Sequence, residues 1–337
     1  MSAFEAARDL WLGNKLPKDE LRFLQLNSPS DPAVTSSFRL GAAAQIVIGL
    51  SALSAAYLHR LRTGIEQNVS VDARHAVLEF LGYYQVQGQL APSKDSLWDS
   101  IAGLYKTQDD SYVRIHTNFP HHRSGILEIL GLTGSSTDVT REEVAEALFR
   151  WDSKSFEEAA AERGMCATAL RSFDEWDRHA QAQALRGVPP VSIKKVGEAP
   201  KRSTARTDKP PGQPLDGVKI LDLTRVLAGP VCGRTLAMYG ADVLWITSPR
   251  LPSLPLIDLD TSRGKRTAQL DLTEPADRVS LRTLVDGADV FLQAYRPGGL
   301  EEKGFGVEEL VKMHPGIVCA NLRAWGWDGP WSNRRAV

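Results

Sequence analysis

The chain has 337 residues, enough for two domains, and its hydrophobic fraction of 42% and charged fraction of 24% are ordinary for a soluble globular protein. The formal net charge of −1 gives no global field that would attract nucleic acid or a membrane surface, so we expect neither as a partner. Cys166, Cys232 and Cys319 are widely spaced, which argues against a disulfide framework and a CxxC zinc site and suits a reducing compartment.

The first 193 residues carry both helical and strand patterns, so we expect a mixed α+β region. The Ala- and Leu-rich segment 38–62 predicts one long buried helix that ends before Gly64, rather than a membrane span. Residues 69–71 are β-branched at both ends and residues 112–116 alternate apolar with polar, so both predict strands. Further helices are predicted at 74–84, 124–132, 141–151, 156–163 and 172–185, the third with a capping box of Thr140 and Glu143.

Residues 194–213 have almost no large apolar side chains and cannot bury enough surface to fold alone, so they predict a linker. From residue 214 to residue 337, strands alternate with helices, which predicts an α/β fold with a Rossmann-like parallel sheet that lacks a GxGxxG motif. A phosphate would lie outside the carboxyl ends of these strands. The predicted strands are 218–223, 242–246, 267–272, 288–292 and 317–322, and the helices are 229–239, 275–285 and 300–313.

Neither end of the chain suggests a targeting signal. Residues 1–12 include acidic side chains and lack the apolar core of a signal peptide, and the last three residues are not a peroxisomal tripeptide. We therefore expect a cytoplasmic location.

A set of short segments in the C-terminal region resembles, in order and spacing, the N-terminal half of the family III CoA-transferases (the CaiB/BaiF type). That family includes formyl-CoA and carnitine CoA-transferases and α-methylacyl-CoA racemases. The matching segments are 214–218 with 222–225, 228–230, 236–243, 263–266, 270–272, 288–290, 295–298, and Trp325-Gly326 with 328–330.

The first 193 residues resemble the later half of the same family. The resemblance lies in 55–67, with its Arg62-Thr63-Gly64 turn, and in 110–113, 164–167 and 172–176. The two halves therefore stand in swapped order. Two interpretations are open: a natural rearrangement, or a piece of a longer tandem protein, which the stop at Val337 favours.

The resemblance implies an activity on acyl-CoA thioesters with no permanently bound cofactor. In this family an aspartate attacks the thioester and forms an aspartyl–CoA intermediate, while backbone N–H groups of a Gly-rich loop stabilise the oxyanion. In the racemase branch a His and an Asp exchange a proton at the α-carbon. The implied partners are an acyl-CoA, a carboxylic acid, and either a second copy of the chain or a longer paralogue.

The catalytic carboxylate has no clear match. In the family it follows the segment that corresponds to Gly329-Pro330, and the racemase pair would also fall beyond that segment. Counting back from Thr63-Gly64, the catalytic position falls on Ser30, so the neighbouring Asp31 is the candidate nucleophile. An Asp–Pro turn is the structural alternative for Asp31.

CoA binding is implied for residues in or near the matched loops, because Arg and Lys suit the phosphates of CoA and a tyrosine can stack on adenine. Two departures could weaken the pocket: 245–247 reads Trp-Ile-Thr instead of Lys-Val-Glu, and Glu301-Glu302 replaces a basic residue. His116, His121 and His122 lack a Cys or carboxylate at ligand spacing, so no metal is expected. The candidate CoA-binding residues are Arg225, Val226, Lys265, Arg266, Tyr295, Arg296 and Arg323.

Three functions therefore remain open from the sequence. The first is transfer of CoA between carboxylic acids, and the second is epimerisation of an α-methylacyl-CoA or similar thioester. The third is a non-catalytic paralogue that binds CoA or associates with a longer relative.

Overall fold

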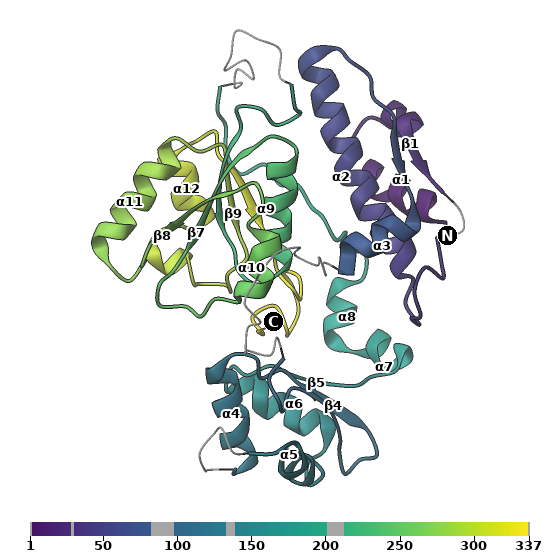
Figure 1. Ribbon diagram of the computed structural model, residues 1–337, viewed down its shortest axis with the longest axis vertical. Coiled ribbons are helices and arrows are strands. Elements are labelled where there is room, and N and C mark those ends of the chain that lie inside the picture. The colour runs from purple at the N-terminus through teal and green to yellow at the C-terminus, as the bar shows by residue number, and fades with distance from the viewer. Residues whose placement is uncertain (1, 28–29, 82–97, 133–138, 201–211, 336–337) are drawn as a thin grey trace, which may run out of the picture.

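The computed structural model describes residues 2–27, 30–81, 98–132, 139–200 and 212–335 (Figure 1). Their buried apolar side chains form separate clusters in three parts of the chain: one in 2–81, one in 98–169 and two in 215–320. The predicted linker is exposed and irregular at 194–200, and its remaining residues 201–211 lie outside the described part.

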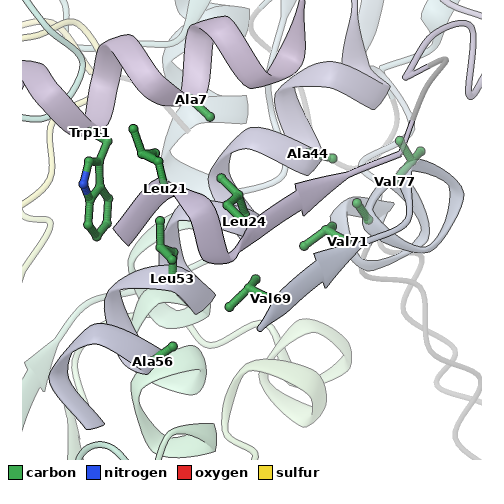
Figure 2. Packing of buried hydrophobic residues seen from close by; sticks show 11 residues of the cluster. Ala7, Trp11, Leu21, Leu24, Ala44, Leu53, Ala56, Val69, Val71 and Val77 are labelled. Carbon is green, nitrogen blue, oxygen red and sulfur yellow. The ribbon is translucent and has the colours of Figure 1, made fainter. Parts of the chain in front are cut away.

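The first part is built around one long helix, α2, which Figure 2 shows packed against α1 and a two-stranded parallel sheet. Trp11 and Leu53 are fully buried in this core. α2 has the length and apolar composition of a membrane span, but its buried face belongs to the core, as predicted. Gly64 ends it with a left-handed φ of 76°. The elements are α1 (Ala3–Gly13), a 3-10 turn (Lys18–Phe23), β1 (Leu24–Leu26), α2 (Leu40–Thr63), β2 (Val69–Val71) and α3 (Ala73–Leu81).

The second part is an antiparallel sheet in the order β3-β4-β5, packed against three helices. Ile115 and Phe156 are fully buried between the two layers. The predicted capping box of Thr140 and Glu143 is present at the start of α5. The elements are β3 (Gly103–Lys106), β4 (Tyr112–Ile115), α4 (Pro120–Leu130), α5 (Arg141–Leu148), α6 (Ser153–Glu162) and β5 (Ala167–Ala169).

The prediction of a single helix over 172–185 is wrong, because the chain breaks into α7 (Phe173–Arg178) and α8 (Ala180–Leu185) at His179. His179 has an extended backbone, and its imidazole Nδ1 accepts a hydrogen bond from the Gln181 N–H. This local bond caps α8 and competes with continuation of the helix.

The third part confirms the predicted α/β fold: five parallel strands in the order β10-β9-β6-β7-β8. β6 is central, with Ile220 opposite Val243 of β7 and Val290 of β9. Leu281 of α11 packs on one face of the sheet and Leu236 of α9 on the other (Figure 1). The elements are β6 (Lys219–Leu223), α9 (Ala228–Met238), β7 (Asp242–Thr247), α10 (Pro255–Thr261), β8 (Arg266–Gln269), α11 (Pro275–Asp286), β9 (Val290–Gln293), a 3-10 turn (Glu301–Lys303), α12 (Val307–Met313) and β10 (Val318–Asn321).

Two predictions for this third part need correction. The helix expected over 300–313 is interrupted at Gly304, whose φ of 83° is left-handed, and continues only as α12. The helix α10 was not predicted, because its sequence of seven residues is too short to show a helical period.

The first and third parts are joined by ion pairs and hydrogen bonds. Arg234 of α9 pairs with Glu79 of α3 as well as with Asp260 of α10. At the other end of the contact, the Arg62 guanidinium donates to the backbone carbonyls of Pro214 and Asp216. α2 therefore lies beside α9. The N-terminus of α2 lies at the end of the molecule where the parallel strands have their carboxyl ends (Figure 1).

Candidate functional site at the carboxyl ends of the parallel strands

The strand order creates a switch point between β6 and β9. From β6 the chain passes through α9 to β7 and β8 on one side, and then returns by α11 to β9 on the other side. In open parallel sheets, ligands bind in the crevice that such a reversal leaves at the carboxyl ends of the strands. The residues that follow β6 and β9 lie at this switch point, and those that follow β10 lie one strand further along the same edge. They include Arg225, Arg296 and Arg323.

The loop after β6 holds a strained backbone. Val226 has a φ of 69°, a conformation that costs a β-branched residue about 1–3 kcal/mol and is found mainly at functional sites. The neighbouring Arg225 donates a hydrogen bond to the carbonyl of Pro252, and its guanidinium lies 5.8 Å from the ring centre of Phe119. The loop thus presents Arg225 beside α9 and against the second part of the chain.

The loop after β9 brings Tyr295 and Arg296 to the same crevice. The Tyr295 N–H donates to Oε1 of Gln293 at 2.8 Å, and the ring packs against the sheet core. Burial raises the pKa of Tyr295, with Arg225 opposing this shift, so the phenol is neutral near neutral pH. Arg296 is exposed and makes no ion pair with any described carboxylate.

After β10, Arg323 stacks on an exposed tryptophan, with its guanidinium carbon 3.8 Å from the ring centre of Trp327. Burial lowers the pKa of Arg323, against the raising effect of Glu301. Its Nε is buried and has no hydrogen-bond partner among the described residues. Stacking holds the guanidinium plane in place while its other nitrogens stay available to a phosphate.

Lys265 and Arg266, two of the predicted CoA ligands, have other partners in the structure. The fully buried Lys265 ammonium donates to Oδ2 of Asp222 and to the carbonyl of Pro230, both at 2.8 Å. Arg266 begins β8, at the end of the sheet opposite the crevice, and pairs with Asp242 at 2.7 Å. We therefore leave both residues out of the proposed site.

Two histidines of the second part of the chain meet Arg335, which follows β10, beside these loops. Nη1 of Arg335 lies 3.1 Å from Nε2 of both His121 and His122, and a guanidinium can only donate, so both Nε2 atoms accept. Burial, followed by His121 and Arg335, lowers the pKa of His122 to about 4. Both imidazoles are thus neutral near pH 7. The described residues contain no group of three or more His, Cys, Asp or Glu that could hold a metal ion.

A cavity of about 250 Å³ adjoins this cluster, between β4, β5 and α6 on one side and residues 325–335 on the other. Its lining includes Cys166, a residue from a segment matched in the sequence to the thioester end of the family's site. Burial raises the pKa of the Cys166 thiol to about 11, so this group stays protonated and is not a nucleophile at neutral pH.

Gln181 holds the backbone of residues 325–331 beside this cavity, a role that no sequence pattern indicated. Its buried amide Nε2 donates to the carbonyls of Trp325 (2.7 Å) and Asp328 (2.8 Å), and its Oε1 accepts from the N–H of Trp331 (2.7 Å). One side chain of α8 therefore fixes the backbone of the loop that follows β10.

Asp31, the candidate nucleophile, lies at the start of α2. Its carboxylate oxygens accept hydrogen bonds from the N–H groups of Gly41 (2.9 Å) and Ala42 (3.2 Å). Phe38, just before the helix, contacts Phe173 of α7 with 5.9 Å between ring centres. The carboxylate thus satisfies the free N–H groups of a helix N-terminus, a structural role that does not require catalysis.

Comparison with known proteins identifies a family for the C-terminal region. Residues 215–337 match CoA-transferase family III. The chain is 28% identical, over 93% of its length, to an acetyl-coenzyme A transferase, nodX, of Hypoxylon pulicicidum, and 26% identical, over 91%, to an acyl-CoA transferase of Gibberella moniliformis. It covers 59% and 58% of these two proteins, so it spans less than two thirds of their length.

A bacterial relative matches a smaller share of the chain at higher identity. The chain is 35% identical to a probable fatty acyl-CoA transferase, Rv3272, of Mycobacterium tuberculosis, over 38% of this chain and 36% of that protein. A crystal structure of Rv3272 aligns with a TM-score of 0.36 and 36% identity, over 38% of this chain and 36% of that one. Residues 215–337 therefore carry the sequence of CoA-transferase family III.

Proposed function

We propose that the chain acts on acyl-CoA thioesters and transfers CoA between carboxylic acids, with the nucleotide bound at the switch-point crevice. The observation that carries the proposal is that Arg225, Arg296 and Arg323 all follow strands at one edge of the sheet, within the region that matches the family. The named relatives, an acetyl-coenzyme A transferase and an acyl-CoA transferase, support the same chemistry.

The nucleotide end of CoA suits this crevice on chemical grounds. Arg225 and Arg296 would pair with the pyrophosphate and the 3′-phosphate, because guanidinium groups bind phosphate oxygens in pairs. Tyr295 would stack on adenine, and the loop at Val226 would bring backbone close to the phosphates. CoA itself is then a substrate that is bound and released in each turnover.

For the covalent step we propose Asp31 as the nucleophile. Its carboxylate would attack the thioester carbonyl and expel the CoA thiolate, leaving a mixed anhydride. The thiolate would then attack the aspartyl carbonyl, release the first acid as a carboxylate and leave an aspartyl–CoA thioester. An acceptor carboxylate would repeat the two steps in reverse order. The N–H groups of Gly41 and Ala42, which hold the Asp31 carboxylate, would stabilise the oxyanion that forms on the aspartyl carbonyl.

A hydroxylamine trap tests this proposal. The protein is incubated with succinyl-CoA and hydroxylamine, which converts an aspartyl thioester or anhydride to a hydroxamate, and peptide mass mapping locates the adduct. We expect a hydroxamate at Asp31, its loss in Asp31→Asn and its retention in Ser30→Ala, which alters the neighbouring residue. An adduct on a different carboxylate would show that this other residue is the nucleophile, and the proposed CoA transfer would still stand. If no adduct forms although CoA binds, the non-catalytic alternative replaces the proposal.

Three further parts of the proposal come from the sequence alone. They are an epimerase-like activity as the alternative reaction, a homodimer or a longer paralogue as the protein partner, and a cytoplasmic location. The cavity beside the crevice favours transfer over epimerisation, because its arginines suit a second, acidic substrate.

A further inference from the structure

The loop between β6 and α9 is fastened at both of its ends by buried polar side chains. The Lys265 ammonium donates to Asp222, in β6, and to the carbonyl of Pro230, in the first turn of α9, both at 2.8 Å. The Thr224 hydroxyl donates to the same carboxylate. α9 also packs closely on the loop: a Cβ on Gly229 would lie 2.4 Å from Cβ of Thr224, so a larger residue would force the two apart. The loop is therefore held between two fixed points.

Trp245 supplies a third fixed point, inside the loop. It lies opposite Asp222 in the register of β7 and β6, so its side chain shares a sheet face with that carboxylate. Its indole N–H donates to the carbonyl of Thr224 at 2.9 Å. Thr224 is fully buried, and within the described ranges its carbonyl accepts from no other group. The indole thus fixes the peptide unit that leads from Thr224 into Arg225.

That peptide unit precedes the strained part of the loop. Val226 has a φ of 69°, and a β-branched residue keeps such a conformation only where its surroundings enforce it. If the carbonyl of Thr224 were free to turn, the backbone could relax Val226 toward a negative φ and carry the Arg225 guanidinium with it. The hydrogen bond from Trp245 opposes this rotation, so it acts on Arg225 through the backbone and not through a ligand.

The aromatic ring of Trp245 is held in place as well. It is 5% exposed and lies over the Lys265 ammonium, with 5.1 Å between Nζ and the ring centre. The sequence departs at 245–247 from the Lys-Val-Glu of the family that it resembles, a change expected to weaken the nucleotide pocket. The geometry indicates the opposite for Trp245, because its N–H supports the loop that carries Arg225.

We propose that Trp245 is a positioning residue for CoA: through the carbonyl of Thr224 it holds the loop after β6 in the conformation that aims the Arg225 guanidinium at the phosphates. This inference rests on the proposed binding of CoA at the switch-point crevice. A residue that served stability alone would leave the affinity of the folded protein for CoA unchanged. A positioning residue changes that affinity, and it does so only while Arg225 is present to be positioned.

A double-mutant cycle, measured by calorimetric titration with CoA, tests the inference. Trp245→Phe keeps an aromatic ring over Lys265 and removes the N–H donor. We expect it to weaken CoA binding by about 5- to 10-fold, the size of one lost hydrogen bond to a buried acceptor. In the Arg225→Gln background the same change should weaken binding by less than about twofold. Trp245→Met, which also lacks the donor, replaces the phenylalanine variant if that one does not fold.

Trp11→Phe is the matched control. The Trp11 indole is likewise buried and donates to a backbone carbonyl, that of Pro17, at 2.8 Å, but it belongs to the core of the first part of the chain. This variant should lose stability in thermal unfolding and keep its affinity for CoA.

The outcomes separate this inference from the proposed function. If the unaltered protein binds CoA and Trp245→Phe binds it equally well, the positioning role is refuted and the proposed function stands. An equal loss of affinity with and without the Arg225 guanidinium, or an equal loss in Trp11→Phe, would also overturn the assignment. If the unaltered protein does not bind CoA, the proposed site fails and the positioning role fails with it.

Discussion

Replacing Lys265 with methionine is expected to lower the free energy of unfolding by about 3–5 kcal/mol, the usual cost of removing one partner of a buried ion pair. Asp222 and Lys265 both have fully buried side chains, and Asp222 also accepts from the Thr224 hydroxyl. Without the ammonium, the Asp222 carboxylate would be an unpaired charge beneath the loop that carries Arg225. Urea unfolding followed by circular dichroism measures the loss.

The loss should depend on pH. Burial raises the pKa of Asp222, while Lys265 lowers it, so the variant removes the opposing effect. A carboxyl whose pKa is raised on folding contributes stability below its unfolded pKa and loses that stability as the pH rises through the folded pKa. The variant should therefore be less damaged at pH 5 than at pH 8.

Two controls separate the buried charge from general loss of packing. The double variant Asp222→Asn with Lys265→Met removes both charges and should be more stable than Lys265→Met alone. Arg266→Met, which breaks only the exposed pair with Asp242, should change the unfolding free energy by less than about 1 kcal/mol. Equal losses for Lys265→Met and Arg266→Met would contradict the buried pair.

The second large effect concerns CoA affinity. Arg225→Gln and Arg296→Gln should each weaken CoA binding by roughly tenfold, since a hydrogen bond between charged groups contributes about 1.5–3 kcal/mol. Isothermal titration calorimetry measures both. Repeating the titration with dephospho-CoA identifies the arginine that contacts the 3′-phosphate, because its variant should lose no further affinity for that ligand.

Arg266→Gln is the matched control for this experiment. It removes a guanidinium at the opposite end of the sheet and should leave CoA affinity unchanged. If Arg266→Gln weakens binding as much as Arg225→Gln does, the nucleotide does not lie at the carboxyl ends of the strands. All three variants could weaken CoA binding at low salt but not at high salt. That result would indicate only a diffuse effect of charge.

Much of the fold could be predicted from local patterns. The long helix before Gly64 and the capping box at Thr140 are signals contained within a few residues, and the structure places both where expected. The alternation of strands and helices after residue 214 predicted the parallel sheet. The break at His179 could not be predicted, because it depends on whether one imidazole bonds to the Gln181 N–H or leaves the helix intact.

Some residues of the candidate site could also be predicted from the sequence, and others could not. Arg225 and Arg296 could be placed because both follow predicted parallel strands, whose carboxyl ends meet at one edge. Lys265 could not be distinguished from them in a basic segment, although an aspartate in the apolar strand 218–223 was a signal that a buried cation was needed. Arg114 and Arg335 come together only through tertiary folding, so no sequence spacing indicates the cavity that they line.

The match to the fungal acetyl-coenzyme A transferase covers 93% of this chain, so it includes parts of both the region before the linker and the region after it. In the structure, those regions meet at the crevice: Phe119, His121 and His122 come from one, and Arg225 and Arg335 from the other.

Hydrogen exchange of the backbone amides, followed by mass spectrometry with and without saturating CoA, tests the central claim most directly. A nucleotide at the switch point should protect residues 224–227, 294–299 and 322–327, which follow β6, β9 and β10, and should leave the amino end of the sheet around Arg266 unchanged. Protection confined to other segments, or none at a CoA concentration that saturates calorimetric binding, would contradict the account.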